Sequence, residues 1–367
     1  MGGYFLLLLI MNFQDLFPVL NHSTYLNTAY SGILSKPLLE WRNKHDVEYL
    51  NEGSNFRVNQ ATITEDLRRK LAEIYQAENI FLTPNFSFGF NTLLNGLDQN
   101  HRFLLLKEDY PSLAYPVKTL GFEFTEVDID INLEQNIIKA IEDFKPTAFA
   151  FSMVQYISGY KLSEDFIKKI KQTYPQILLM ADGTQFCGTT PFNFKQSGLD
   201  ALISSGYKWL LSGFGNGFTL LSEQLIGELY QDRVNKKLPT APFLIGKSHL
   251  DMCFEPGHLD TLNFGSLYHS LNFLQSTGFV QIEKSNQLLC QKARLEFYKR
   301  GLLPVWMTER ESQSTIISLP LEEKLVQKLA GANILCSARG AGTRFSFHFY
   351  NTEDDLQKLL DVLDGKS

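Results

Sequence analysis

The amino-acid sequence predicts an α/β protein: a large domain with a mainly parallel sheet covered by helices, and a smaller α+β C-terminal domain. Two observations support this fold class. From about residue 100, short apolar segments alternate with longer amphipathic segments, as in a parallel sheet buried between helices. After about residue 245, long helical patterns come first and strand patterns follow. The chain of 367 residues is long enough for two cores.

Six short segments are predicted strands of the large sheet, because each is mostly apolar. They are Arg102–Lys107, Phe122–Val127, Thr147–Ser152, Ile177–Asp182, Ala201–Ser204 and Gly217–Leu221. Continuous apolar character, in place of a strict alternation, indicates strands that are covered on both faces.

The segments between these strands, and those before them, carry helical signals. The predicted helices are Ile63–Tyr75, Phe88–Leu97, Leu133–Phe144 and Glu164–Tyr174. In the last of these, apolar residues recur at helical spacing. Ser163 is a suitable N-cap for it, and Glu164 and Asp165 place negative charge in its first turn, where the helix dipole favours it.

The C-terminal part has a different texture. It reads as helices Gly265–Leu274 and Val280–Tyr298, strands near Ser314–Leu319 and Thr343–Tyr350, and a final helix Glu353–Leu363. Pro239 and Pro242 lie in a predicted linker, Leu238–Gly246. We therefore expect an N-terminal extension over residues 1–24, a large domain over 25–240 and a small domain over 241–367.

Composition and charge exclude several function classes. The chain is 44% hydrophobic and 20% charged, with a net charge of −6, so it is neither disordered nor strongly basic. We expect no nucleic-acid partner and no attraction to anionic lipid. The four cysteines and seven histidines show no metal-ligand spacing, which predicts no metal site and isolated thiols in a reducing cytoplasm.

The N-terminus carries an apolar run, Tyr4–Met11. It is shorter than the roughly 20 residues that a membrane-spanning helix needs. It also lacks the basic flank and the cleavage site of a signal peptide. We expect no membrane attachment, and Met11 is as good a candidate for the true start as Met1.

Two predicted strands end in polar groups that suggest chemistry. The apolar segment Ile177–Asp182 ends in a carboxylate, which is costly to bury unless it meets a cation or hydrogen-bond donors. Lys208 follows the next strand and is surrounded by apolar residues. A lysine in a dry pocket loses part of its charged form and becomes a nucleophilic amine, although a surface lysine lying along apolar neighbours is the simpler interpretation.

Taken together, Asp182 and Lys208 indicate pyridoxal phosphate. This cofactor needs a lysine to form a Schiff base with its aldehyde and an anion to keep its ring nitrogen protonated. Its phosphate needs hydroxyls and a helix N-terminus, which the segment Thr83–Gly89 offers. The glycines of Ser212–Gly217 precede a strand, not a helix, so they predict a tight turn and not a dinucleotide site.

The sequence resembles the class V aminotransferases, a family of fold-type I pyridoxal-phosphate enzymes that also includes cysteine desulfurases and kynureninase. Four segments carry the resemblance: Tyr25–Gly32, Asp182–Gln185, Ser204–Trp209 and Thr343–Asp354. It implies a fold-type I transferase with a seven-stranded sheet. It further implies a homodimer that acts on a small amino acid or amine.

The resemblance also implies roles for matching positions. Lys208 and Asp182 would be the catalytic residues. The cofactor contacts would be the Phe86 N–H, Ser87, Tyr110, Gln185, Ser205, Tyr207 and, from the neighbouring subunit, Thr261. Arg344 would bind the substrate carboxylate, with Asn27, Tyr30 and Tyr156 as further substrate contacts. Arg339 would be a second anion contact or a surface residue.

Three departures from members of the family keep alternatives open. Tyr110 stands where cysteine desulfurases have a histidine, and Cys336 precedes Arg339 in an order that does not fit their nucleophilic cysteine. Leu113 replaces an acidic residue of kynureninase. We expect an aminotransferase-like enzyme that acts at Cα. The alternatives are a desulfurase, lyase or epimerase of the same family, and a catalytically silent cofactor-binding protein.

Overall fold

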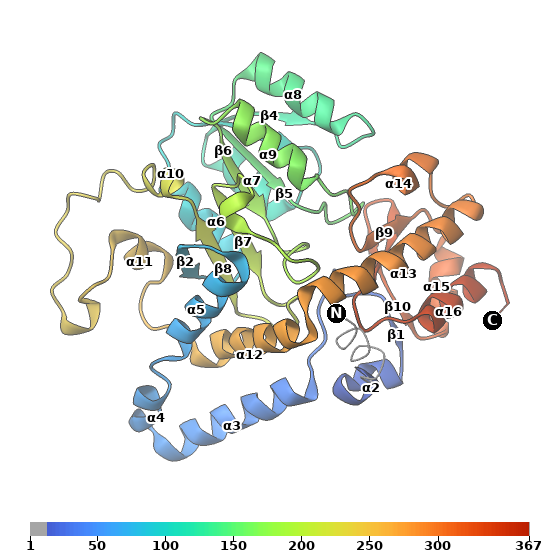
Figure 1. Ribbon diagram of the computed structural model, residues 1–367, viewed down its shortest axis with the longest axis horizontal. Coiled ribbons are helices and arrows are strands. Elements are labelled where there is room, and N and C mark those ends of the chain that lie inside the picture. The colour runs from blue at the N-terminus through green and yellow to red at the C-terminus, as the bar shows by residue number, and fades with distance from the viewer. Residues whose placement is uncertain (1–12, 367) are drawn as a thin grey trace.

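The computed structural model describes residues 13–366, so the apolar run Tyr4–Met11 lies outside the described residues. Its centre is a seven-stranded sheet of order β2-β8-β7-β6-β5-β3-β4 (Figure 1). The strands are β2 (Asn79–Leu82), β3 (Arg102–Leu106), β4 (Glu123–Val127), β5 (Ala148–Ser152), β6 (Leu178–Asp182), β7 (Ala201–Ser205) and β8 (Gly217–Leu221). Strand β8 pairs antiparallel with both β2 and β7, and the other pairs of this sheet are parallel. This confirms the mainly parallel fold.

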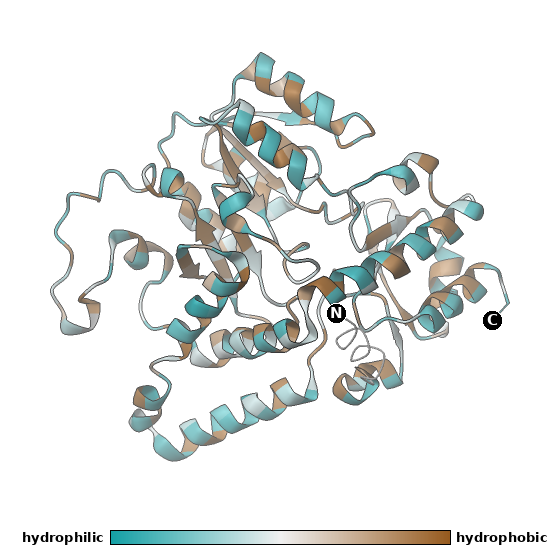
Figure 2. Cartoon of the chain, in the orientation of Figure 1, coloured by the Kyte–Doolittle hydropathy of each residue, from teal (hydrophilic) through white to brown (hydrophobic). Residues whose placement is uncertain are grey.

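The central strands are apolar on both sides because helices cover both faces of the sheet. Every residue of β5, β6 and β7 is buried, and the sheet is largely brown in Figure 2, whereas the surrounding helices show one polar and one apolar face. The helices before and between the strands are α3 (Lys36–Glu52), α4 (Ser54–Asn59), α5 (Ile63–Tyr75), α6 (Phe86–Leu94), α7 (Pro111–Thr119), α8 (Leu133–Phe144), α9 (Glu164–Thr173) and α10 (Glu223–Ile226).

Local signals set several helix ends. The Ser163 side chain accepts a hydrogen bond from the Phe166 N–H at 3.1 Å, so the predicted N-cap of α9 is confirmed. Helix α12 (Thr261–Thr277) begins four residues before the predicted start at Gly265, because Asp260 caps it by accepting from the Asn263 N–H. Strand β2 was not predicted: its four residues pair only with β8, at the sheet edge.

The C-terminal part packs around a second, smaller set of strands. Its elements are α11 (His249–Phe254), α13 (Phe279–Lys299), α14 (Val305–Glu309), β9 (Ile316–Leu319), α15 (Glu323–Gly331), β10 (Ile334–Leu335), β11 (Ser337–Arg339), β12 (Gly342–Ser346) and α16 (Glu353–Leu363). The predicted strand over Thr343–Tyr350 therefore ends at Ser346. Beyond it, residues 347–350 stay buried but leave the ladder.

The N-terminal segment joins this C-terminal part. After α2 (Phe13–Leu16), strand β1 (Thr24–Tyr25) pairs in parallel with β10, and Leu26 lies in the same apolar cluster as α13 and α16. Conversely, α12 packs on α5 and α3 beside the large sheet (Figure 1). The domain boundaries at residues 25 and 240 stay predictions.

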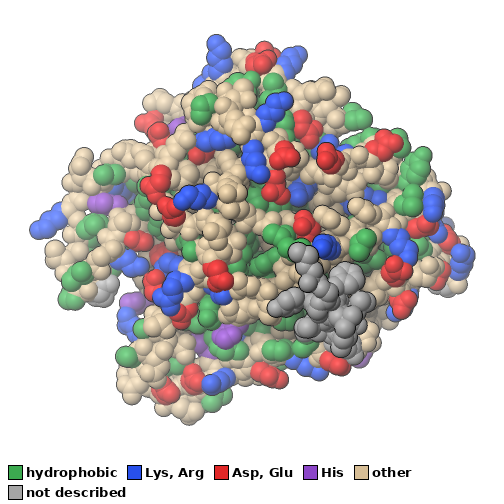
Figure 3. Space-filling model, in the orientation of Figure 1, with side chains coloured by type: hydrophobic (Ala, Val, Ile, Leu, Met, Phe, Trp, Pro, Cys, Tyr) green, Lys and Arg blue, Asp and Glu red, His purple; other side chains and the backbone are tan. Residues whose placement is uncertain are grey.

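The surface charges and the apolar character of the helices give no sign of a nucleic-acid or membrane partner among residues 13–366. Basic and acidic side chains are interspersed over the face seen in Figure 3, without a large field of one sign. None of the helices between residues 13 and 366 has both the length and the apolar character that crossing a bilayer requires.

Candidate active site

The carboxyl ends of β5, β6 and β7 open into a cavity of about 420 Å³. Most of the residues predicted to form a site line it, namely Phe86, Ser87, Tyr110, Tyr156, Asp182, Gln185, Ser205, Tyr207 and Lys208. Parallel strands bring their carboxyl ends to one edge, which is where ligands of open α/β sheets bind. The sheet therefore assembles residues that are more than a hundred positions apart in the chain.

Asp182 is the last residue of β6 and is buried. Its Oδ1 accepts a hydrogen bond from the Thr184 N–H at 2.8 Å. Burial raises the pKa of this carboxyl to about 6, while the hydrogen bonds from Thr184 and the charge of Lys208 oppose the increase. A carboxylate kept at this depth is suited to face a positively charged ring nitrogen.

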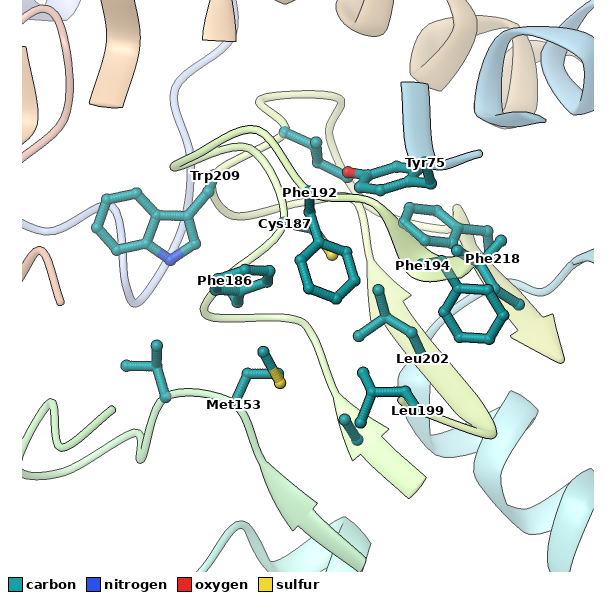
Figure 4. Packing of buried hydrophobic residues seen from close by; sticks show 14 of the residues in the cluster. Tyr75, Met153, Phe186, Cys187, Phe192, Phe194, Leu199, Leu202, Trp209 and Phe218 are labelled. Atoms are coloured by element: carbon teal, nitrogen blue, oxygen red, sulfur yellow. The ribbon is translucent and has the colours of Figure 1, made fainter. Parts of the chain in front are cut away.

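Lys208 follows β7 on a loop that the N-terminal segment holds in place. The Gly32 N–H donates to the Tyr207 carbonyl at 2.8 Å, and a Cβ at Gly32 would lie 2.1 Å from the Lys208 carbonyl oxygen. The side chain of Trp209, next to Lys208, packs among Phe186 and the other buried residues of Figure 4. The loop that carries Lys208 is therefore anchored from both sides.

The Lys208 amine is buried and makes no ion pair within residues 13–366. Its Nζ lies 5.8 Å from the Tyr110 ring centroid and 5.5 Å from that of Tyr207. Burial lowers its pKa to about 8, although the charge of Asp182 opposes this. At neutral pH a measurable fraction is thus the free, nucleophilic amine.

The N-terminus of α6 faces the same cavity. Asn85 caps this helix by accepting from the Phe88 N–H at 2.8 Å. The Phe86 N–H, a predicted phosphate contact, donates to Ser205 Oγ at 2.9 Å. Ser87 lies in the first turn and lines the cavity. Helix N-termini carry partial positive charge, so this end of the cavity suits an anion.

Thr184, which had no assigned role, connects two walls of the cavity. Its Oγ1 accepts from the Ser205 N–H at 3.1 Å, so the loop after β6 is tied to the end of β7. Only the pairing of the two strands brings these residues together, because they are 21 positions apart.

Asp109 and Ser152 were also missed. The Asp109 carboxylate accepts from the Tyr110 N–H at 2.7 Å, from Ser152 Oγ at 2.6 Å and from the Ser152 N–H at 2.8 Å. It thereby fixes Tyr110, whose ring meets that of Tyr156 edge-on at 5.5 Å. The available signal was a carboxylate three residues after β3 ends at Leu106, which is weaker than that of Asp182, the last residue of β6.

Gln185 joins the cavity to the N-terminal segment. Its Nε2 donates to the Ala29 carbonyl at 2.9 Å, and its Oε1 accepts from the Trp209 indole N–H at 2.8 Å. An amide nitrogen has two hydrogens, so one remains for a ligand in the cavity.

Arg344 does not line this cavity, but its charge acts on Lys208 and Tyr207. Arg344 lies on β12, is 2% exposed, and donates to the Tyr156 carbonyl. Burial, with the charge of Arg339, lowers its pKa to about 10. The Arg344 Nε and the Asn27 Oδ1 are buried without a hydrogen-bond partner among residues 13–366. Arg339 lies over the Tyr30 ring at 5.1 Å.

Four predicted site residues do not line this cavity, namely Asn27, Tyr30, Thr261 and Arg344. Thr261 begins α12, hydrogen-bonds His45 Nε2 at 3.0 Å and lines a separate cavity. Cys336 stands between β10 and β11. It does not line the Lys208 cavity, and neither do Cys187, Cys253 or Cys290.

Comparisons with known proteins agree with this geometry. Residues 40–359 match the family described as Aminotransferase class-V. An uncharacterized aminotransferase, YcbU, of Bacillus subtilis is 21% identical, with 97% of each chain covered. A probable cysteine desulfurase of Ureaplasma parvum is 22% identical over 89% of this chain and 88% of its own.

A solved structure shows a similar fold. It is a lysine-to-alanine mutant of C-DES with glycine covalently linked to its PLP cofactor. It superimposes with a TM-score of 0.82 at 20% identity, covering 96% of this chain and 99% of that one.

The chain belongs to the class V aminotransferase family of fold-type I, pyridoxal-phosphate-dependent enzymes. The residues present fit this cofactor. A buried amine without an ion pair, a buried carboxylate and a capped helix N-terminus line one cavity, which are the groups that an aldehyde, a pyridine nitrogen and a phosphate require. The predicted fold, family and cofactor are thus confirmed.

Proposed function

We propose that this chain is an aminotransferase that acts at Cα of an amino acid or a related amine. The observation that carries the proposal is the meeting of Lys208 and Asp182 in one cavity, with Arg344 bonded to the carbonyl of Tyr156, which lines it. In this arrangement Lys208 would hold the aldehyde of pyridoxal phosphate and Asp182 its ring nitrogen. Ser87, Ser205 and Tyr207 would bind its phosphate, Tyr110 would stack on its ring, and Gln185 would donate to its phenolic oxygen.

Bound pyridoxal phosphate supplies an electron sink for the electron pair that is released when a bond at Cα breaks. The chain itself supplies the proton transfer. Because burial brings the pKa of Lys208 to about 8, its amine can both take and return a proton near neutral pH. Lys208 is the only lysine among the residues that line this cavity, so we assign it the proton at Cα.

Arg344 would orient the substrate. Its guanidinium is held by the Tyr156 carbonyl and retains an unpaired Nε, so a carboxylate can pair with it. The unpaired Asn27 Oδ1 would accept a hydrogen bond from a substrate donor. A carboxylate fixed at Arg344 selects which bond at Cα points toward the cofactor.

A homodimer completes the proposal. Thr261 lies in a cavity apart from Lys208, so it can reach a cofactor only in a second copy of the chain. Helices α3 and α4 expose Leu50 at 83% and Val58 at 73%, and paired subunits would cover such side chains. Size-exclusion chromatography with light scattering should give twice the chain mass of 41.9 kDa. The cytoplasmic location stays a prediction.

A lyase reaction is the second candidate, because one relative is named a probable cysteine desulfurase. Transfer of sulfur to a cysteine of this chain receives no support, since no cysteine within residues 13–366 lines the cavity.

A panel of amino acids decides between these reactions. Purified protein is incubated with each amino acid, with and without a 2-oxo acid acceptor, and the products are identified by mass spectrometry. Transamination predicts an oxo acid from the donor and a new amino acid from the acceptor. Products that form without an acceptor and include ammonia or a reduced sulfur species would refute the aminotransferase proposal in favour of a lyase.

A further inference from the structure

A second polar cavity, of about 790 Å³, lies between α9, α13 and the segment 308–315. Figure 1 shows α13 running from the large sheet toward the C-terminal strands. Apart from Cys290, the side chains that line the cavity are polar or charged. None of them has a role in the proposed reaction.

Buried polar atoms without partners indicate where a ligand is accommodated, because leaving such an atom unsatisfied costs about 1–3 kcal/mol. Near the candidate active site, the criterion finds Asn27 Oδ1 and Arg344 Nε. Applied to the rest of the described residues, it finds six atoms, of which Tyr75 OH, Ser337 Oγ and His348 Nδ1 are scattered and the other three are Asn286 Oδ1, Thr315 Oγ1 and Arg310 Nε. Asn286, Thr315 and Arg310 all line the second cavity, so half of these atoms gather there.

The inner wall of this cavity also holds a buried cation. Arg294 is 5% exposed, and its guanidinium donates to the carbonyls of Ser314 and Ile316. It forms no ion pair with a carboxylate among residues 13–366. A buried charge without a counter-ion is strongly disfavoured, so this wall is suited to an anionic group.

Asn286 and Thr315 define the rest of the ligand. Asn286 is 2% exposed, and its Nδ2 already donates to the Thr189 carbonyl at 3.5 Å. Its Oδ1 therefore requires a donor from outside. Asn286 and Arg294 are eight positions apart on α13, which places them on one face of the helix, two turns from each other. The matching ligand has an anionic end and a hydrogen-bond donor.

The carboxylates near the cavity lie at its outer edge. Asp165 and Glu311 are exposed, and Glu164 pairs with Lys161 at 3.7 Å. These carboxylates are far enough out to leave the inner wall cationic. The arrangement favours a small ligand that places its carboxylate on the inner wall and its positive or neutral donor toward the opening of the cavity.

We propose that this cavity is an accessory binding site for a small α-hydroxy or α-amino carboxylate, with Arg294 binding the carboxylate and Asn286 and Thr315 binding the hydroxyl or amine.

The site is next to the active site. A small cavity of about 30 Å³ is lined by Asn286 and Thr315 and also by Val154 and Gln185, which line the Lys208 cavity. The small cavity therefore adjoins both larger ones.

Glycolate tests the proposal independently of the proposed function, because it has a carboxylate and a hydroxyl but no amine to react with an aldehyde. Calorimetric titration of the purified protein should show saturable binding, and glycolate should raise the thermal midpoint by about 2–4 °C near saturation. Acetate, which lacks the donor, should bind at least about tenfold more weakly, in proportion to the loss of a hydrogen bond.

Thr315→Val is the decisive variant, because it removes a hydroxyl that has no partner and preserves the shape of the side chain. It should keep or raise the thermal midpoint without glycolate and weaken glycolate binding at least about tenfold. Leu288→Ala, an exposed change on the same helix at a residue that does not line the cavity, is the matched control and should bind as the unchanged protein does.

Arg344→Met locates the binding. Glycolate affinity that survives Arg344→Met and is lost in Thr315→Val supports the accessory site. Affinity that is lost in Arg344→Met and kept in Thr315→Val places glycolate in the active site and overturns the proposal. Absence of saturable binding overturns it as well, since water would then satisfy the wall.

Discussion

The two sides of the active site are built in different ways. The side with Lys208 and Asp182 comes from β6, β7 and the loops that follow them, so residues close in sequence meet at adjacent strand ends. The side with Arg344, Tyr156 and Asn27 comes from three distant segments that meet only after β12 has paired with its neighbours.

The two sides therefore depend on different packing contacts for the positions of their side chains. The Lys208 side depends on a sheet whose register is fixed by buried apolar residues, so its two reacting groups are rigidly placed. The Arg344 side depends on packing between the N-terminal segment, the large sheet and the C-terminal strands. We expect changes on the first side to abolish the chemistry and changes on the second to alter substrate choice.

The largest effect should come from Lys208→Ala. No other lysine lines the cavity, so the variant has no amine to hold the cofactor or to move the proton, and turnover should fall by more than about a thousandfold. The visible absorption of the purified protein should disappear with it. Lys195→Ala, a change of an exposed lysine paired with Glu78, is the control. Retained visible absorption in Lys208→Ala would show that another residue holds the cofactor.

Asp182→Asn should reduce kcat by about a hundredfold or more. The amide oxygen can still accept from the Thr184 N–H, but the variant has no charge to keep the ring nitrogen protonated. Because the charge of Asp182 raises the pKa of Lys208, the midpoint for Lys208 should also fall below about 8. Asp182→Glu keeps the charge and should retain the midpoint better. Equal kinetics for Asp182→Asn and the unchanged enzyme would contradict the assigned role.

Arg344→Met tests whether the second side of the site binds the substrate carboxylate. Loss of the charge-assisted hydrogen bonds to a carboxylate costs about 1.5–3 kcal/mol, or roughly 10–150-fold in kcat/KM. The loss should appear mainly in KM, and the reaction with an amine that lacks a carboxylate should be nearly unaffected. Steady-state kinetics with matched amino-acid and amine substrates measure this ratio. An equal loss for both substrates would mean that Arg344 has a structural role only.

The smallest effect concerns pH. Reductive methylation of Lys208 should rise with a midpoint near 8, because the deprotonated amine reacts and burial lowers its pKa. The unfolded chain binds this proton more tightly than the folded chain, so this group makes apoprotein stability increase between about pH 8 and the ordinary lysine value of 10.5. Arg339→Gln removes a positive charge that lowers the pKa of Lys208, so the midpoint should move slightly upward. A downward movement would exclude this electrostatic effect.

Local signals in the sequence were sufficient to predict six of the seven strands of the sheet and to propose Asp182 and Lys208 as the reacting groups. Apolar runs that end in Asp182 and just before Lys208 mark buried strands and their carboxyl ends, and both signals are local. The N-cap at Ser163 is a local signal of the same kind. Short-range physical chemistry was enough in these cases.

The hydrogen-bond partners of the site residues could be found only from the tertiary structure. The contacts of Asp109 with Ser152, of Thr184 with Ser205 and of Arg344 with Tyr156 join residues that no pattern connects. The same holds for the wall formed by Asn286, Arg294 and Thr315. Hydrogen bonding of buried polar groups is satisfied by whichever segment packing brings near, and packing depends on the whole chain.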